Sequence, residues 1–296
     1  MTIYTSLLTD AGKINTPKWL PNNTMFEGIT GSVAYGVSND TSDMDIVGFC
    51  MPPKELMFPH LAGEIPGFGT QHKRFEQYQE HHIEVKEWSK TFDITIYSIV
   101  KFFQLTMENN PNMVDALFLP RRCVLHSTPI YEKVRDNRNL FLHKGSWPKF
   151  KGYAYSQLHK INIGCNKQNP KRAESIAKYG YDVKFGYHIV RLLLEVEQIL
   201  TEHTLDLSRN ASVLKAIREG AWSLDKLKSW FEEKEEGLEK VYHNSTLRYT
   251  PNEQEIKNLL LEVIEMHYGN IPLELNVEAK AKSLIREMQE LLERYK

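Results

Sequence analysis

The sequence predicts an α/β (α+β) fold, with a small mixed sheet and flanking helices over residues 1–145 and an all-α domain over residues 146–296. Two observations carry this prediction. In the first part, short apolar runs are bounded by Gly, Pro and Asn, as is typical of strands and turns. From about Gly145 onward, apolar residues recur every three or four positions, which is the period of an amphipathic helix.

Two strands are expected to flank a glycine-bearing turn near the N-terminus. Met25–Gly28 is a short apolar run that leads into the turn, and Asp43–Met51 is a second run that a Pro-Pro pair ends. Residues 54–80 are rich in Pro and Gly, which predicts an irregular connection or a lid. His81–Trp88 alternates loosely and predicts another strand.

The clearest strand precedes the first long helix. Phe92–Ile96 alternates between apolar and polar residues, so Asp93 faces away from its apolar neighbours. Ser98 is suited to cap a following helix, whose apolar residues predict a buried stripe. Further helices are predicted in the second part, over Ser146–Asn162, Gly186–Leu200, Leu224–Val241, Asn252–His267 and Val277–Tyr295.

Composition limits the class of protein. Apolar residues make up 41% and charged residues 25%, an ordinary globular mixture, and the net charge of −1 lacks the basic character of many nucleic-acid-binding proteins. The cysteines Cys50, Cys123 and Cys165 lie far apart, which favours neither a zinc site nor disulfides and indicates a reducing compartment. Since no signal segment or long apolar span is visible, we expect a cytoplasmic protein without a membrane segment.

The most informative stretch combines a small turn with two spaced carboxylates. Asp43 and Asp45 stand two residues apart in an apolar run, so in a strand they share one face about 7 Å apart. Two carboxylates held in this way can share divalent metal ions. Gly31 and Ser32, about ten residues upstream, form a turn whose backbone N–H groups can hold phosphate oxygens. The pattern predicts a site for transfer of a nucleotidyl group.

Each of these residues also has a simpler interpretation. An isolated Asp-x-Asp is commonly a solvated edge or a turn, and Gly31 and Gly36 serve a turn in either interpretation. Tyr35 is predicted either to contact nucleotide or to pack in the core. Ser42 is predicted either to contact nucleotide or to cap the loop. The Gly-Ser turn upstream and Asp93 downstream favour the metal site.

A second group of polar residues lies on a predicted helix. Lys184, His188 and Arg191 are spaced so that all three share one helix face. A basic cluster beside apolar residues requires an anionic partner. We predict that it holds the triphosphate or the incoming substrate. The alternative is an ion-pair network with Asp182, Glu195 or the first domain.

Two other groups carry weaker signals. His72, His81 and His82 match no spacing of zinc ligands. A basic and aromatic region is predicted either to bind RNA or to be a solvated helix face. It comprises Trp147, Lys149, Lys151, Tyr153, Tyr155, His159, Lys160, Lys167, Lys171 and Arg172.

The order of these residues resembles the polymerase-beta nucleotidyltransferase superfamily, and more closely the RNA-ligase-associated, polymerase-beta-like family of predicted nucleotidyltransferases. The landmarks are Gly31–Gly36, Ser42–Gly48, Asp93, Tyr97–Phe102, Asn110–Asn112, Lys178–Lys184, His188–Leu193 and Ile217–Trp222. The chain departs from the expected pattern at Asp115, where we expect Glu, and at Phe185, where we expect His. These departures bear on substrate choice and leave the three carboxylates unchanged.

The resemblance implies a nucleotidyltransferase that depends on Mg²⁺, or on Mn²⁺, and uses ATP or another NTP. Asp43, Asp45 and Asp93 are the expected catalytic and metal-binding residues, with Asp93 completing a second metal site. The helical domain is expected to bind nucleotide or substrate. The expected nucleotide-binding residues are Gly31, Ser32, Tyr35, Ser42, Lys184, His188 and Arg191.

The resemblance also implies a role in RNA repair, with an RNA end, tRNA-like, as the hydroxyl acceptor. Two alternatives stay open. One is a protein adenylyltransferase that modifies Ser, Thr or Tyr hydroxyls. The other is a non-catalytic nucleotide-binding or antitoxin-like module, against which the intact set of three carboxylates argues. The sequence leaves the choice of NTP, the number of nucleotides added and the oligomeric state open.

Overall fold

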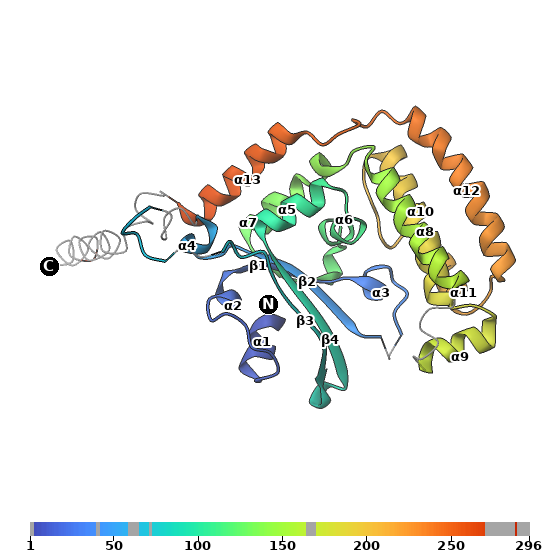
Figure 1. Ribbon diagram of the computed structural model, residues 1–296, viewed down its shortest axis with the longest axis horizontal. Coiled ribbons are helices and arrows are strands. Elements are labelled where there is room, and N and C mark those ends of the chain that lie inside the picture. The colour runs from blue at the N-terminus through green and yellow to red at the C-terminus, as the bar shows by residue number, and fades with distance from the viewer. Residues whose placement is uncertain are drawn as a thin grey trace.

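The computed structural model describes residues 3–39, 42–58, 65–70, 73–163, 170–269 and 288. The described residues form a five-stranded sheet in the order β3-β4-β2-β1-β5, with helices around it (Figure 1). β2 and β4 run parallel, whereas the other neighbours are antiparallel, so the predicted mixed sheet is confirmed. The strands are β1 (Thr24–Ile29), β2 (Met44–Cys50), β3 (Gln77–Val85), β4 (Lys90–Ser98) and β5 (Val124–Ser127).

The alternation of β4 assigns its two faces as the sequence predicted. Phe92, Ile94 and Ile96 are buried in one apolar cluster, so Asp93 projects from the opposite face of the sheet. The neighbouring β2 is buried on both faces, as expected of a central strand. Its residue Ile46 lies in the same cluster as Phe92, whereas Val47 lies in the larger cluster on the other face.

Helices cover both faces of the sheet. The helices α1 (Tyr4–Asp10) and α2 (Leu20–Asn23) bury Leu8 and Leu20 against one face. Against the other face lie α5, α6 and α7, and α5 begins at the predicted cap, since Ser98 Oγ accepts the Lys101 N–H at 3.1 Å. These three helices are α5 (Ile99–Met107), α6 (Pro111–Leu117) and α7 (Pro129–Asp136). The other helical elements of this half are α3 (Gly31–Ala34), α4 (Lys54–Met57), η2 (Lys86–Trp88), η3 (Arg121–Cys123) and η4 (Arg138–Phe141).

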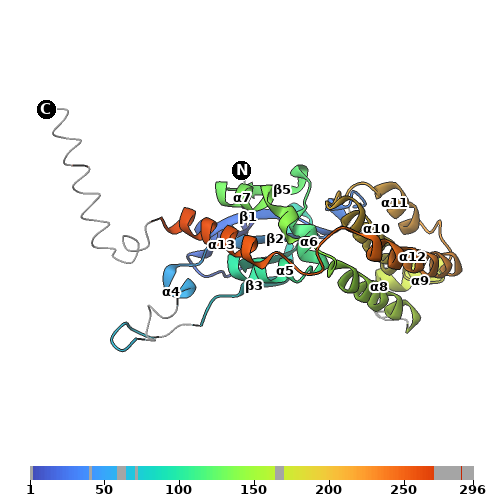
Figure 2. The same cartoon turned by 90° about the horizontal axis from the view of Figure 1, so that it is seen from above.

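The second half is helical and lies mainly at one end of the sheet (Figure 2). At its centre α10 packs against α8, α11 and α12. One continuous cluster of buried side chains joins both halves, since it contains Phe49 and Phe102 as well as Trp147 and Leu192. The helices are α8 (Ser146–Asn162), α9 (Pro170–Tyr179), α10 (Val183–Glu202), α11 (Ala211–Arg218), α12 (Leu224–Asn244) and α13 (Glu253–Tyr268).

The helix α13 returns to the first half and packs against α7 (Figure 1). Lys133 of α7 pairs with Glu262 of α13 at 2.5 Å. At the end of α13, the Tyr268 hydroxyl donates to the Pro52 carbonyl oxygen beyond β2. The chain therefore wraps its last described helix around the sheet half.

Several boundaries differ from the sequence prediction. Helix α10 begins at Val183, three residues before the predicted start, because Asp182 Oδ1 accepts the Lys184 N–H at 3.0 Å and caps the helix. The strand predicted over His81–Trp88 instead runs from Gln77 to Val85 and ends in η2. Helices α9 and α11 were not predicted. His72, Cys165 and, except for residue 288, the helix predicted over 277–295 lie outside the described residues. Among the described helices, none has the length and apolar character to cross a membrane.

We predict that Gly48→Ala destabilises the fold strongly. A Cβ atom at this position would overlap the backbone oxygen of Phe26 and stand 2.8 Å from Ile96 Cδ1. Overpacking against fixed backbone should lower the free energy of unfolding by about 2 kcal/mol or more. Urea unfolding measures this change. Gly237→Ala in α12 is the control, since a Cβ there meets nothing within 4 Å and should stabilise the helix by roughly 0.5–1 kcal/mol.

Candidate active site

Two of the three predicted carboxylates lie side by side on one face of the two parallel strands, and the third is close enough to act on Asp45 electrostatically. Asp45 of β2 and Asp93 of β4 are directly paired in the parallel register, so their side chains project side by side from the same face. Asp43 stands two positions before Asp45 and is exposed at the start of β2. Asp45 and Asp93 are half-buried. The structure therefore brings the three carboxylates to one end of the sheet.

The Gly31 turn lies directly against the Asp45 carboxylate. Gly31 has a φ of +64°, and a Cβ atom there would overlap Asp45 Oδ2. Only glycine satisfies both the left-handed backbone and this close approach. The backbone N–H of Thr30 donates to the Asp45 carbonyl oxygen at 2.8 Å, which ties the turn to β2. The predicted phosphate turn and metal carboxylates are thus in contact.

Mutual repulsion among the carboxylates is visible at Asp45. Burial raises the pKa of Asp45 to about 6, and the negative charges of Asp93 and Asp43 add to this rise. Lys184 and His81 act in the opposite direction. Cationic charge close to Asp45 would therefore be stabilised, as it would relieve the repulsion.

A β-bulge surrounds Asp93 with histidines. The pairing of β3 with β4 shifts between Glu80 and Ile83, opposite Asp93. There His82 adopts a φ of +55°, and its backbone N–H donates to Asp93 Oδ1 at 2.7 Å. His81 Nδ1 lies 3.5 Å from Asp93 Oδ2. The strained bulge thus holds the third carboxylate in a defined orientation.

Two arginines hold the turn from the outside. Arg122 of η3 donates through Nη2 to the Ala34 carbonyl oxygen at 3.0 Å. Arg218 of α11 donates to the Val37 carbonyl oxygen and lies over the Tyr187 ring, 5.3 Å from its centroid. Within the turn, the N–H groups of Tyr35, Gly36 and Val37 donate to the carbonyl oxygens of Gly31, Val33 and Ser32. The turn is therefore fixed by both halves of the chain.

The first turn of α10 brings basic side chains toward the carboxylates. Lys184 is exposed and interacts electrostatically with Asp45 and Asp43, which raise its pKa, although surrounding protein and Arg172 lower it overall. His188 is half-buried beside Tyr187, with ring centroids 4.3 Å apart. Burial and four neighbouring cations lower the pKa of His188 well below its usual value, so this imidazole is neutral at pH 7.

Arg191 has a different environment from Lys184. Its Nη1 donates to Asp115 Oδ2 at 2.6 Å and to Glu195 Oε2 at 2.7 Å, and the side chain is 2% exposed. Asp115 Oδ2 also accepts the Tyr35 hydroxyl at 2.6 Å, and the Arg191 guanidinium lies over the Tyr35 ring. Burial raises the pKa of Glu195 to about 8. These contacts match the alternatives that the sequence left open, an interdomain ion-pair network for Arg191 and core packing for Tyr35.

Other predicted residues occupy simpler positions. Ser42 Oγ accepts the Asn39 N–H at 3.0 Å and donates to Asn39 Oδ1 at 2.9 Å, as a loop cap does. Ser32 is half-buried in the turn, and its carbonyl accepts the Val37 N–H at 2.8 Å. In the basic and aromatic region, Lys151 pairs with two glutamates of α12 at 2.7 Å each. That part of the region is therefore neutralised within the protein.

The donor chemistry at the carboxylates fits a hard divalent cation. Carboxylate oxygens are the ligands that Mg²⁺ prefers, and the repulsion at Asp45 favours a bound cation. Within the described ranges, no three His, Cys, Asp or Glu side chains converge as a ready-made cage. Mg²⁺ is usually held by one or two carboxylates together with water and substrate phosphates, so an open set of this kind suits it.

The mixed sheet, the paired carboxylates and the glycine turn define a polymerase-beta-like nucleotidyltransferase. The family model described as the RNA repair pathway DNA polymerase beta family matches residues 13–268. The chain belongs to this family. The match covers both the sheet and the helices from α8 to α13, so the helical half is part of the family pattern.

Individual relatives are more distant. An uncharacterized 38.9 kDa protein from the nrdC–mobD intergenic region of Enterobacteria phage T4 is 25% identical over 142 residues, which are 47% of this chain and 39% of that protein. The chain thus matches about two fifths of that relative's length. A crystal structure of a nucleotidyltransferase-like protein from Exiguobacterium sibiricum 255-15 is 10% identical, with a TM-score of 0.27, over 96% of this chain and 90% of that one. This score is too low to support an argument about the fold.

The structure adds residues to the site that sequence reasoning missed. Arg218 lies in the family landmark Ile217–Trp222, and that landmark was the available signal. His81 and His82 were considered only as zinc ligands, and nothing in the sequence marks the bulge that brings them to Asp93. Arg122 contacts the turn from a segment that is distant in the sequence, and no spacing pattern predicts such a contact.

We predict that Asp45→Asn stabilises the metal-free protein above pH 6. The pKa of Asp45 rises from 3.8 in the unfolded chain to about 6 on folding, so stability present below pH 4 is lost as the pH rises through 6. Removing this ionisation should add about 2–3 kcal/mol to the free energy of unfolding at pH 8 and much less at pH 4. Urea unfolding with a chelator measures the change. Asp43→Asn, at an exposed position, is the control, and an equal gain there would contradict the assignment.

We predict that Arg191→Met destabilises the fold. The substitution leaves Asp115 and Glu195 buried without their cation, which should cost about 3–5 kcal/mol. Arg209→Met, which removes an exposed partner of Glu202, should cost less than about 1 kcal/mol. Thermal and urea unfolding compare the two. Unchanged stability with a raised KM for NTP would instead support the predicted nucleotide contact.

Proposed function

We propose that the protein is a Mg²⁺-dependent nucleotidyltransferase that transfers NMP from an NTP to a hydroxyl at an RNA end. The observation that carries the proposal is the side-by-side pairing of Asp45 and Asp93, with the Gly31 turn against Asp45 and the Asp43 charge acting on it. Family membership supports nucleotidyl transfer as the reaction. The described fold keeps these groups on rigid strands, where their geometry is preorganised.

The residues around the carboxylates have different proposed roles. The Gly31–Ser32 backbone and the Lys184 ammonium lie on the β2 side and would bind the triphosphate. Neutral His188 beside Lys184 can donate or accept a hydrogen bond without adding charge. Arg191 and Tyr35 act at a distance, because they hold α10 against α6 through Asp115.

The reaction is an in-line displacement at phosphorus. The acceptor hydroxyl gives up its proton to solvent as its oxygen forms a bond to the α-phosphorus, the bond from this phosphorus to the α,β-bridging oxygen breaks, and pyrophosphate leaves with that oxygen. Asp43, Asp45 and Asp93 would hold Mg²⁺, which supplies charge neutralisation of the phosphates when it is bound. The protein's own contribution is positioning and electrostatic stabilisation, as in phosphoryl transfer generally.

An RNA acceptor is supported by the family description, which places the family in an RNA repair pathway. An end that is tRNA-like fits this description. A protein hydroxyl as acceptor is the alternative that the same chemistry permits, and it is an outcome of the experiment below. The overall charge of −1 means that RNA contacts must come from a local surface.

We predict label transfer from an α-labelled NTP to RNA. The protein is incubated with each α-labelled NTP, Mg²⁺ or Mn²⁺, total RNA and a cell lysate. Asp45→Asn should lower the rate at least about 100-fold, because a positioned charge at the reacting phosphate is lost. Asp10→Asn, at an exposed carboxylate of α1, should transfer label like the unaltered protein.

The position of the label decides between acceptors. Label in RNA that depends on Asp45 supports the proposal and names the base. Label in a protein band would move the acceptor to a protein hydroxyl. Absence of transfer with every NTP, together with NTP binding that Asp45→Asn leaves unchanged, would overturn the proposal and leave a binding module.

A further inference from the structure

A strip of polar side chains continues from Asp93 along the outer strands of the sheet. Gln77 and Gln79 of β3 pair in register with Tyr97 and Thr95 of β4, so all four share the face that carries Asp93. Gln77 and Gln79 are exposed, and Thr95 and Tyr97 are half-buried beside them. We call these four residues and His81 the polar strip.

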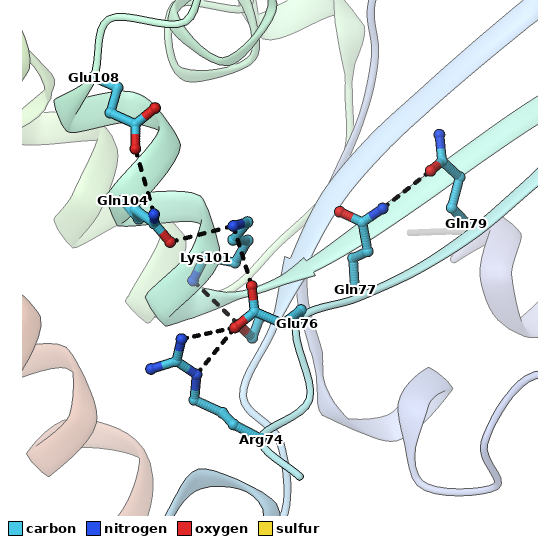
Figure 3. A network of polar contacts seen from close by, with 8 residues as sticks. Arg74, Glu76, Gln77, Gln79, Lys101, Gln104 and Glu108 are labelled. Atoms are coloured by element: carbon cyan, nitrogen blue, oxygen red, sulfur yellow. Dashed lines mark hydrogen bonds and ion pairs between the residues drawn. The ribbon is translucent and has the colours of Figure 1, made fainter.

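Hydrogen bonds run in series along the polar strip. Gln77 Nε2 donates to Gln79 Oε1 at 3.0 Å (Figure 3), and Gln79 Nε2 lies 2.8 Å from His81 Nε2. When the Gln79 amide donates to His81 Nε2, the proton of the imidazole is on Nδ1. His81 Nδ1 lies 3.5 Å from Asp93 Oδ2, so this proton is directed at the carboxylate. The polar strip is therefore continuous with the reaction centre.

Two cations mark the other end of the polar strip (Figure 3). Arg74 donates to Glu76 Oε1 through Nε at 3.2 Å and Nη2 at 2.7 Å. Lys101 Nζ lies 3.1 Å from Glu76 Oε2 and donates to Gln104 Oε1 at 3.3 Å. The Glu76 carboxylate thus pairs with two cations, and Gln104, which accepts from Lys101, in turn donates to Glu108 Oε1 at 3.4 Å. Glu76 and His81 are five residues apart, which spans about 17 Å of strand.

We propose that the polar strip, with Arg74 and Lys101, is the surface along which a single-stranded RNA acceptor reaches the carboxylates. This inference rests on the proposed function. The order β3-β4-β2-β1 supports it, because Asp93 lies on the β3 side of the pair and Asp45 lies on the side of the Gly31 turn. The triphosphate and the acceptor therefore approach the reacting phosphorus from opposite sides, as in-line displacement requires.

The chemistry of the polar strip fits RNA. Exposed glutamine amides both donate and accept hydrogen bonds, which suits base edges and the 2′-hydroxyl. Tyr97, paired in register with Gln77, is half-buried and packs against the larger apolar cluster. Arg74 and Lys101 share the single carboxylate of Glu76, and both can also pair with phosphate. An acidic side chain, Glu76, competes with phosphate for both cations, so the protein holds them in place when RNA is absent.

The decisive variant is Arg74→Gln/Lys101→Gln. Binding of a fluorescent single-stranded RNA of about 12 nucleotides is followed by anisotropy at several salt concentrations. We expect weaker binding and a salt slope that is smaller by roughly 1.4, which is two phosphate contacts at about 0.7 each. The control Arg209→Gln/Lys240→Gln changes the net charge equally at exposed ion pairs on α12 and beyond α10, and should leave both quantities unchanged.

Two further variants separate the parts of the surface. Glu76→Gln frees both cations and should tighten RNA binding severalfold, a gain that damage to the fold cannot produce. Gln77→Ala/Gln79→Ala should weaken RNA binding by about tenfold without changing the salt slope, since no charge is removed. Gln254→Ala, which removes an exposed glutamine paired with Asn258 on α13, is the matched control.

The readouts distinguish this inference from the proposed function. Weaker RNA binding in the Arg74/Lys101 variant with unchanged NTP binding supports the inference, even if no label transfer is found, and then only the proposed function fails. RNA binding and a salt slope like those of the Arg209/Lys240 control overturn the inference while label transfer can still stand. Label transfer to a protein with no detectable RNA binding overturns it as well.

Discussion

The parallel pairing of β2 with β4 is the constraint on which the rest of the site depends, because it sets Asp45 and Asp93 side by side. Burial of Asp45 and the like charge of Asp93 both raise the pKa of Asp45, so its ionised form opposes folding. Buried apolar clusters on both faces of the sheet hold the two strands in place against that repulsion. A parallel pair also requires a long connection, and here the connection carries β3, the strand that bounds Asp93 on its other side. The same connection that makes the pairing possible therefore supplies the histidine bulge and the β3 residues of the polar strip.

Cationic side chains around the carboxylates divide into two kinds, and burial decides which kind each one is. Arg191 is buried and forms ion pairs with Asp115 and Glu195. Because Asp115 belongs to α6, the first of these pairs joins α10 to α6. Lys184, two turns earlier on the same helix, is exposed and interacts with Asp45 and Asp43. One helix thus fixes its own position through its buried arginine and presents a lysine to the site through its first turn. The ionised carboxylates lower the free energy of unfolding, and such a loss of stability is common at functional sites.

Local patterns in the sequence predicted what depends on neighbouring residues. The alternation of β4 predicted the face of Asp93, and the Ser98 cap and the span of α8 were confirmed, because each depends on a few adjacent residues. The spacing of Lys184, His188 and Arg191 placed them on one helix, yet it could not show that Asp115, 76 residues away from Arg191, neutralises the arginine. The β2–β4 register and the bulge at His82 are likewise set by contacts between distant segments. The periodicity of the sequence predicts which face of a helix or strand a side chain is on, whereas the tertiary fold determines which residue it contacts.

The continuous core between the two halves bears on how the site works. If α10 belonged to a separate body, Lys184 would meet the carboxylates only when that body closed over the sheet. Instead, a single apolar cluster extends from Phe49 to Leu192, and the Arg191–Asp115 pair crosses the junction within it. Moving α10 away would expose the apolar cluster and separate the Arg191–Asp115 ion pair. Breaking the ion pair alone would cost several kcal/mol of free energy. Arg218 and Arg122 add hydrogen bonds from both halves to the turn that lies against Asp45. The positions of the charged side chains around the carboxylates are therefore set by the folded core, and such preorganisation is the main way in which a protein stabilises a charged transition state.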